Sequence, residues 1–311
     1  MKKIKMILTA LIGALFLGTA AAAASTTGFA AWTFSSNSYN SQSIKGAVNE
    51  WEFVSYEDIF EFDEETGTIL CIKQIMDENG KVTIPKEING VPVTYIDKYA
   101  FSNQPNLTSI VIEAENLTIE SYAFYGDYNL REITLPSSTK LLKYTFAYSG
   151  SYNTNTKTYS IDSVTFTGNA TELKGNQIFK GLEINTITIP AIVTNVEKSF
   201  FDGVEDYQMI NYGGSIEDFV GTDHNNDTYS IFEGLVYNLR NRNAGTYAYQ
   251  APTALTISGR VFYLNQSNFT QNLLHYYAED GSYIVYNFDN RIKVSSNTYD
   301  NTNCYYYYIA E

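Results

Sequence analysis

The residues best suited to binding a metal form the run Asp223-x-Asn225-x-Asp227. Oxygen ligands at positions 1, 3 and 5 are the spacing with which a calcium loop begins. The rest of that loop is missing, because position 6 is Thr228 where Gly is needed and position 12 is Gly234 where Glu is needed. Asn and Asp are also ordinary turn residues. The run is therefore a candidate calcium site, with a plain polar loop as the stronger interpretation.

The sequence offers little for catalysis. His224 and His275 are the only histidines, and neither lies in an HExxH or GxSxG context. No Cys and His residues have the spacing of a zinc site. Two of the 34 acidic residues could meet in space, as in a glycosidase, but so many carboxylates make that signal unspecific. We predict that the chain is not an enzyme and needs no cofactor.

The net charge argues against a nucleic-acid-binding protein, and the cysteine content argues against a disulfide-rich fold. The formal net charge of −14 would repel nucleic acid. Cys71 and Cys304 are the only cysteines, so disulfides do not form a framework. A bridge between these two would need their Cα atoms within ~7 Å, which the sequence leaves open.

The N-terminal residues have the pattern of a secretory signal. Residues 1–5 are basic, residues 6–18 are apolar and residues 19–25 are small. The apolar run is shorter than the ~20 residues that a membrane-spanning helix needs. We predict a signal peptide over residues 1–24, with cleavage near Ala24 or as late as Ala31, and no membrane span afterwards. The protein should then be secreted, with possible retention at the cell surface.

Two segments precede the regular part of the chain. Residues 25–49 include a Ser- and Asn-rich stretch that indicates a linker. Residues 50–80 are strongly acidic, which is typical of a solvated face, and they include a β-prone stretch at residues 68–75. We interpret residues 50–80 as an N-terminal cap.

Apolar residues recur in the middle of the chain as aliphatic-x-x-aliphatic-x-aliphatic. Successive copies begin 23, 31, 23 and 23 residues apart, and the polar residues 150–159 account for the longer interval. Between the copies lies an aliphatic residue five positions before a Phe. A fixed period of this length predicts a solenoid whose units bury their apolar sides against each other. The copies begin at Leu107, Leu130, Ile161, Ile184 and Tyr207, and the aliphatic and Phe residues are Ile96 and Phe101, Ile119 and Phe124, Leu141 and Phe146, and Val196 and Phe201.

These residues resemble a known repeat family. VTIP at 82–85, INGVPVTYIDKYAF at 88–101, LREITLP at 130–136 and INTITIP at 184–190 are similar to the BspA-type leucine-rich repeats of bacterial surface proteins. The chain departs from the family in lacking the Cys after the Ala-Phe pair and in having Thr167 where a Pro is usual. The resemblance implies a leucine-rich repeat solenoid over residues 81–220, with a short β-strand and a turn or helical segment in each unit.

The 23-residue rhythm is lost after residue 220. Residues 221–311 contain 14 of the 27 tyrosines and have strand patterns at residues 273–277, 283–288 and 291–294. We predict a small Tyr-rich antiparallel β region, either a domain of its own or a C-terminal cap.

The solvent-facing positions of the repeat strands are the candidate ligand-binding face. Most are small and polar and lack the Trp and Arg concentration of a hot spot. We expect a protein or glycan partner at the cell surface, and the family resemblance implies adhesion. The alternative is a structural component of an extracellular assembly, and a secreted hydrolase is the lesser alternative. The candidate residues are Ser109, Val111, Arg131, Glu132, Thr134, Ser163, Thr165, Thr186, Thr188, Gln208 and Asn211.

Overall fold

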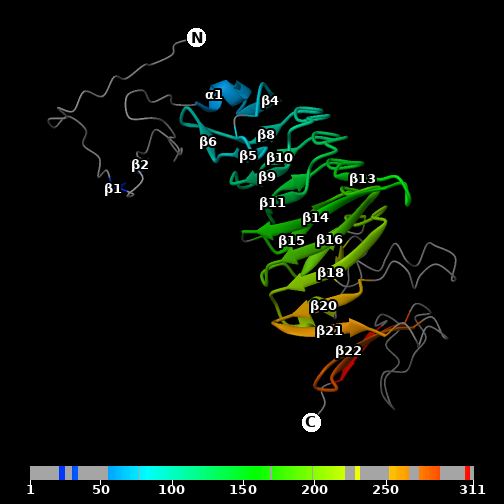
Figure 1. Cartoon of the computed structure of the whole chain (residues 1–311). Helices are drawn as coiled ribbons and strands as arrows, with labels where there is room; N and C mark the ends of the chain where they lie inside the picture. Colours follow the sequence, from blue (N-terminus) through cyan, green and yellow to red (C-terminus); the bar gives the residue numbers. More distant parts are fainter. Residues whose placement is uncertain are drawn as a thin grey trace.

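The computed structural model describes residues 55–75, 77–168, 170–197, 199–220, 228–231, 252–265, 273–287 and 305–308, together with two short strands near the N-terminus. These two strands, β1 (Ala21–Ala24) and β2 (Ala30–Thr33), pair antiparallel. Most of the predicted signal peptide and linker, and the calcium candidates Asp223, Asn225 and Asp227, lie outside the described residues. Figure 1 shows the repeat region as a stack of strands that progresses from the cyan to the orange part of the chain.

The chain alternates between two sheets, so that each coil contributes one strand to each of them (Figure 1). The larger sheet runs in parallel from β5 to β20. Its parallel strands are β5 (Lys81–Ile84), β9 (Ser109–Ile112), β11 (Glu132–Pro136), β14 (Thr158–Thr167), β16 (Leu182–Ile189), β18 (Asp206–Tyr212) and β20 (Ala254–Ile257).

The smaller sheet covers the opposite side of the coils. Its parallel strands are β4 (Thr68–Ile72), β8 (Tyr95–Ile96), β10 (Thr118–Ile119), β12 (Lys140–Leu141), β15 (Glu172–Gly175) and β17 (Asn195–Glu197). At its two ends, β3 (Phe60–Asp63) and β19 (Thr228–Ser230) pair antiparallel with β4 and β17. Between β5 and β18 the described residues form strands and turns without a helix, so this half of each coil is a short strand where the sequence allowed a helical segment.

The core lies between the two sheets. In β9 the side chains of Ile110 and Ile112 are buried, while those of Ser109 and Val111 face outward, as the alternation predicts. The same register aligns Ile110 with Ile133 of β11, and so on along the sheet. Full burial of one such side chain contributes roughly 1.5–3 kcal/mol. The prediction of a strand-rich repeat fold is confirmed.

A ladder of phenylalanines fills the turn side of the core. The rings of Phe101, Phe124, Phe146 and Phe179 are fully buried. They stack on one another with centroid distances of 4.7, 4.8 and 5.7 Å. The interpretation of these regularly spaced phenylalanines as core residues is correct.

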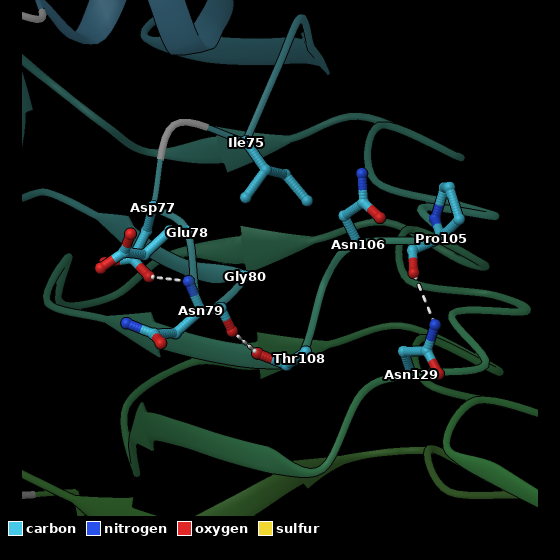
Figure 2. A pocket seen from close by; sticks show the side chains of 9 residues that line it. All are labelled: Ile75, Asp77, Glu78, Asn79, Gly80, Pro105, Asn106, Thr108 and Asn129. Carbon is cyan, nitrogen blue, oxygen red and sulfur yellow. Dashed lines mark hydrogen bonds between the residues drawn. The ribbon is translucent and has the colours of Figure 1, made fainter.

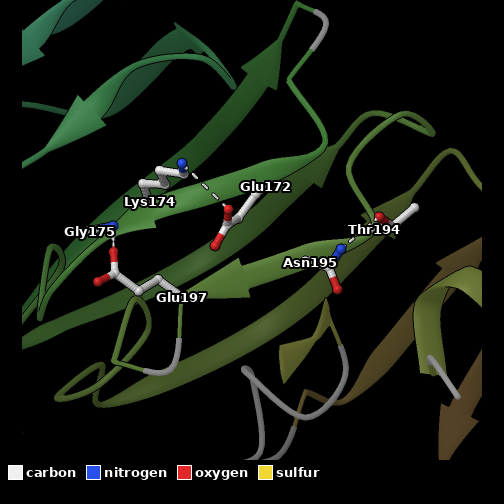
Figure 3. A network of polar contacts seen from close by, with 6 residues as sticks. All are labelled: Glu172, Lys174, Gly175, Thr194, Asn195 and Glu197. Atoms are coloured by element: carbon white, nitrogen blue, oxygen red, sulfur yellow. Dashed lines mark hydrogen bonds and ion pairs between the residues drawn. The ribbon is translucent and has the colours of Figure 1, made fainter. Parts of the chain in front are cut away.

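The coil that contains β15 departs from the regular register. β15 pairs with β12 through Lys174 and Gly175 but with β17 through Glu172 and Leu173. Gly175 is not among the residues that pair with β17, and its N–H donates to Oε2 of Glu197 at 2.7 Å (Figure 3). A Cβ at Gly175 would lie 2.6 Å from the Ile178 side chain and 2.9 Å from the backbone oxygen of Leu141, so any other residue would force one of these neighbours to move.

In residues 50–80, the predicted N-terminal cap, helix α1 (Tyr56–Ile59) starts with a capping box formed by Ser55 and Asp58. The strand predicted at residues 68–75 is β4, which ends at Ile72. Before β8, the strands β6 (Glu87–Ile88) and β7 (Val91–Pro92) form a hairpin. Its turn residues Asn89 and Gly90 both have positive φ, as a type I′ turn requires.

The polar insertion forms a second hairpin. β13 (Ser151–Asn153) pairs antiparallel with the first residues of β14, which is ten residues long because it extends beyond the neighbouring strand β11. The insertion therefore projects from the coil without disturbing the register of the sheet.

The large sheet continues beyond residue 220. Helix α2 (Ile216–Val220) follows β18, and β20 then pairs in parallel with β18. The strands after β20 pair antiparallel in sequence. They are β21 (Arg260–Leu264), β22 (Leu273–Ala278), β23 (Tyr283–Asn287) and β24 (Tyr305–Tyr308), and the strand predicted at residues 291–294 lies outside the described residues.

Candidate functional site

The outward face of the large sheet carries two rows of side chains in register. One row contains Ser109, Glu132, Ser163 and Thr186. The other contains Val111, Thr134, Thr165, Thr188 and Asn211. The structure thus brings nine of the eleven candidate residues together on neighbouring strands, and we call these two rows the strand face.

Two candidates lie beside these rows. Arg131 precedes β11, and its Nη1 donates to the backbone carbonyls of Leu130 and Tyr128 at 3.0 and 3.3 Å. Gln208 lies on β18, where its Nε2 donates to Oδ2 of Asp206 at 2.7 Å. Both side chains are turned toward their own chain segment, so they contribute less to the face than expected.

Five residues of the rows were not among the candidates, and two of them, Lys81 and Ala254, end the first row opposite Ser109 and Met209. Met209 occupies the position in β18 that pairs with Thr186, and its side chain is exposed. Thr83 and Thr256 extend the second row at its two ends. The 23-residue period identifies Met209, because it lies 23 residues after Thr186.

The chemistry of the strand face is that of hydroxyl groups and short side chains. Glu132 is the one ionisable residue of the two rows between β9 and β18. Threonine is stiff at χ1, and each backbone is fixed by a strand on either side. The face is therefore a flat, rigid, nearly uncharged surface that suits recognition better than acid–base catalysis.

An open recess lies between successive turns near β5, and Figure 2 shows the side chains that line it. Its volume is about 500 Å³. The polar groups that line the recess form hydrogen bonds within and between the turns. Oδ1 of Asp77 accepts from the backbone N–H of Asn79 at 2.7 Å, and the Thr108 hydroxyl donates to the Asn79 carbonyl. Nδ2 of Asn129 donates to the carbonyl of Pro105 at 2.6 Å. The recess follows from the stacking of the turns and has no group set apart for chemistry.

A family comparison agrees with this geometry. The family model described as "BspA type Leucine rich repeat region (6 copies)" matches residues 94–174 and 154–225. Residues 94–225 are a BspA-type leucine-rich repeat region. No curated protein and no solved structure matches the chain. Repeats of this family are typical of surface or secreted proteins and generally mediate protein interactions.

One carboxyl with a shifted pKa, that of Asp206, lies at the start of β18. Burial raises the pKa of Asp206 to about 6, and the neighbouring charge of Glu183 adds to the shift. The two residues pair across β16 and β18. Oε1 of Glu183 accepts a hydrogen bond from the Thr158 hydroxyl at 2.7 Å. Desolvation and strand pairing account for the shift without a catalytic role.

The other chemical candidates form no metal site within the described residues. In these ranges, no three His, Cys, Asp or Glu side chains come together as a metal site would require. The thiol of Cys71 donates to Oε2 of Glu61 at 3.2 Å, and Cys304 and His224 lie outside the described ranges. None of the described helices is both long and apolar enough to span a membrane.

Proposed function

We propose that the chain is a secreted or cell-surface adhesion module whose repeats stack as a solenoid and bind a protein through the strand face. The signal-like residues 1–24 support secretion. The observation that carries the proposal is the second row of the strand face, which runs in register from Thr83 to Thr256 across the parallel strands.

The size of this surface sets the strength of binding. Seven strands at ~4.8 Å spacing give a face only ~29 Å long and two rows of side chains wide, so its area is smaller than the ~800 Å² that each partner gives to a standard interface. Without a concentration of Trp or Arg, such a face suits a short segment of the partner or a weak, multivalent contact. Adhesion through many copies of the protein would combine many such weak contacts.

A screen of the full chain against extracellular matrix proteins and cell-wall glycans tests the proposal. The double variant Thr134→Lys and Thr165→Lys places two charges side by side on the strand face. Binding of the matrix protein identified in the screen should fall by about tenfold, because two ammonium groups must be desolvated. Thr118→Lys, on β10 of the other sheet, is the matched control and should bind as the parent does. Equal binding by the double variant would refute the strand face as the site.

The structural alternative rests on the ends of the large sheet. Among the described strands, β5 and β24 lie at its two edges, where backbone groups can pair with another chain. Sedimentation over a range of protein and calcium concentrations tests for assembly. A protein that stays monomeric throughout would rule out the structural role.

A further inference from the structure

Tyrosines form a continuous row on the turns that follow the smaller sheet. Tyr99, Tyr122 and Tyr144 occupy the same place in three successive coils, two residues before a buried Phe. The rings of Tyr99 and Tyr122 stack at 5.6 Å, and those of Tyr122 and Tyr144 lie 5.4 Å apart. We call these three residues the tyrosine row. The row lies outside the phenylalanine ladder and is accessible to solvent, with Tyr99 half exposed.

A second group of rings joins this row. Tyr125 contacts Tyr122 edge to face at 5.6 Å and Tyr148 of the next coil at 5.9 Å. Tyr148 in turn contacts Tyr159, which belongs to the β13–β14 hairpin. The rings of Tyr128 and Tyr152 also pack on Tyr159. We call these five residues the tyrosine cluster, and the row and cluster together the tyrosine surface.

The backbone of the tyrosine row is held in an unfavourable conformation. Tyr99, Tyr122 and Tyr144 have φ of 62°, 64° and 67°, in the left-handed region where a bulky residue is uncommon. Asn is better tolerated in this region and occurs there at Asn103 and Asn116 of the same coils. The repeated presence of Tyr where Asn would be less strained points to a use for the exposed ring.

Three lysines place positive charge on the tyrosine row. The Lys98 ammonium lies 5.0 Å from the Tyr99 centroid and 5.6 Å from that of Tyr122. The ammonium groups of Lys143 and Lys180 lie 4.7 and 5.1 Å from the Tyr144 centroid. Ion pairs to the described carboxylates are found for Lys86, Lys174 and Arg260 and not for these three. On a chain of net charge −14, this local concentration of cations selects an anionic ligand.

The composition of the surface distinguishes between classes of ligand. Of the five exposed tyrosines among the described residues, four belong to it, whereas the exposed aliphatic residues Leu70, Ile192 and Met209 lie elsewhere. Protein interfaces combine aromatic residues with an apolar, desolvated centre, which this hydroxyl-rich surface lacks. The negative faces of the edge-to-face rings suit the weakly positive C–H bonds of a sugar, and the phenol groups can exchange hydrogen bonds with its hydroxyls.

We propose that the tyrosine surface binds an anionic polysaccharide, with sugar rings packed on the tyrosine cluster and carboxylate or sulfate groups on Lys98, Lys143 and Lys180. The row extends across three coils, which matches a linear polymer better than a single sugar. This site is separate from the strand face, so it stands or falls independently of the protein-binding proposal.

Calorimetry and affinity electrophoresis of the full chain test the proposal with three anionic probes, polygalacturonate, hyaluronan and chondroitin sulfate. Dextran serves as the neutral polysaccharide and poly-L-glutamate as the acidic polypeptide. At least one anionic polysaccharide should bind, should change the intrinsic tyrosine fluorescence, and should bind more tightly than dextran or poly-L-glutamate. Binding should weaken as salt is added, because ammonium groups contribute.

Variants locate the site. Replacing all three residues of the tyrosine row by Asn preserves the left-handed backbone and should weaken binding by about tenfold or more. Tyr263→Thr on β21 removes an exposed ring elsewhere and is the matched control. Changing the three lysines to Gln leaves the rings in place and should weaken binding while reducing its salt dependence.

Four results would overturn the proposal. They are no binding to any of the three anionic polysaccharides, equal binding to dextran, tighter binding to poly-L-glutamate, and unchanged binding by either triple variant. Tighter binding to poly-L-glutamate would reassign the surface to an acidic protein segment. Thermal unfolding followed by circular dichroism verifies that each variant is folded, and the lysine variant decides the question if the Asn variant does not fold.

Discussion

The buried carboxyl of Asp127 should make the protein less stable as the pH rises above about 4. The Asp127 side chain is fully buried in the turn after Phe124. Its Oδ1 accepts from the backbone N–H of Gln104 at 2.7 Å, whereas Oδ2 has no hydrogen-bond partner. Burial raises the pKa of this carboxyl well above its ordinary value.

The sign of the effect follows from proton binding. Between the unfolded pKa of about 3.9 and the higher folded pKa, the folded state keeps a proton that the unfolded chain has lost. The free energy of unfolding therefore falls as the pH rises, by at most about 1.4 kcal/mol per pH unit. The stabilising contribution is complete below the unfolded pKa and is lost as the pH rises through the folded pKa.

Asp127→Asn tests this reasoning. The amide oxygen can still accept from Gln104, and the variant has no proton to lose. The neutral Asp127 carboxyl and the Asn amide each bury one polar group without a hydrogen-bond partner. The free energies of unfolding of parent and variant should therefore agree within about 1 kcal/mol at pH 4. With increasing pH the variant should become progressively more stable than the parent.

Urea denaturation followed by circular dichroism from pH 4 to pH 8 measures the difference. Glu132→Gln is the control, because it removes an exposed carboxylate from a neighbouring strand. Its unfolding free energy should follow that of the parent. If the curves for the parent and for Asp127→Asn run parallel over the whole range, the carboxyl is not held neutral and the reasoning is wrong.

Two further predictions concern the core and the edge of the repeats. Phe124→Ala removes a fully buried ring stacked at 4.7 Å on Phe101 and 4.8 Å on Phe146, and should lower the free energy of unfolding by about 3–5 kcal/mol. A loss below about 1 kcal/mol in urea denaturation would contradict the ladder. For Asp206, with a pKa raised to about 6, stability should decline as the pH rises from about 4 toward 6, and this decline should be smaller in Asp206→Asn, in which only the contribution of Asp127 remains. A carboxyl titration followed by NMR that gives a pKa near 4 for Asp206 would refute this.

The sequence predicts the core well because two independent signals agree there. The 23-residue period defines the coils, and the alternation within each strand defines the buried side, as at Ile110 and Ile112. The phenylalanines five residues after an aliphatic residue add a third constraint. Each signal reflects burial, which restricts residue type strongly.

The smaller sheet was harder to predict. Strands such as β8 and β10 contain two residues each, which is too short for an alternation to be recognised. The register shift at β15 depends on the close approach of Gly175 to Ile178 and on the Glu197 carboxylate from the next coil. Contacts between coils of this kind leave no periodic trace in the sequence.

The candidate site was predicted in part. The strand face follows from alternation, but two adjacent exposed positions, Gln208 and Met209, precede Ile210 in β18, and alternation alone does not decide between them. The tyrosine surface was missed because its contacts join different coils. A signal did exist, since Tyr lies two residues before Phe101, Phe124 and Phe146.

The residues of the tyrosine surface are stronger evidence for a ligand than those of the strand face. Threonine on the strand face is favoured by β propensity alone, so a scaffold without any ligand would also contain it. Tyr99, Tyr122 and Tyr144 are opposed by local energetics, because a left-handed backbone costs a residue with a Cβ roughly 1–2 kcal/mol. Such residues persist when something compensates for the strain.

The insertion strengthens this argument. The β13–β14 hairpin packs Tyr159 on Tyr128 and Tyr148, and Tyr152 on Tyr159, and so widens a narrow row into a broad aromatic surface. Insertions in repeat proteins map to one face, which is often the binding face. The tyrosines of the row and the insertion beside it are separate features of the chain that converge on the same turns, and Gln177 takes the same left-handed backbone in the next coil without an aromatic ring. The turn side therefore carries more information about a ligand than the regular strand face does.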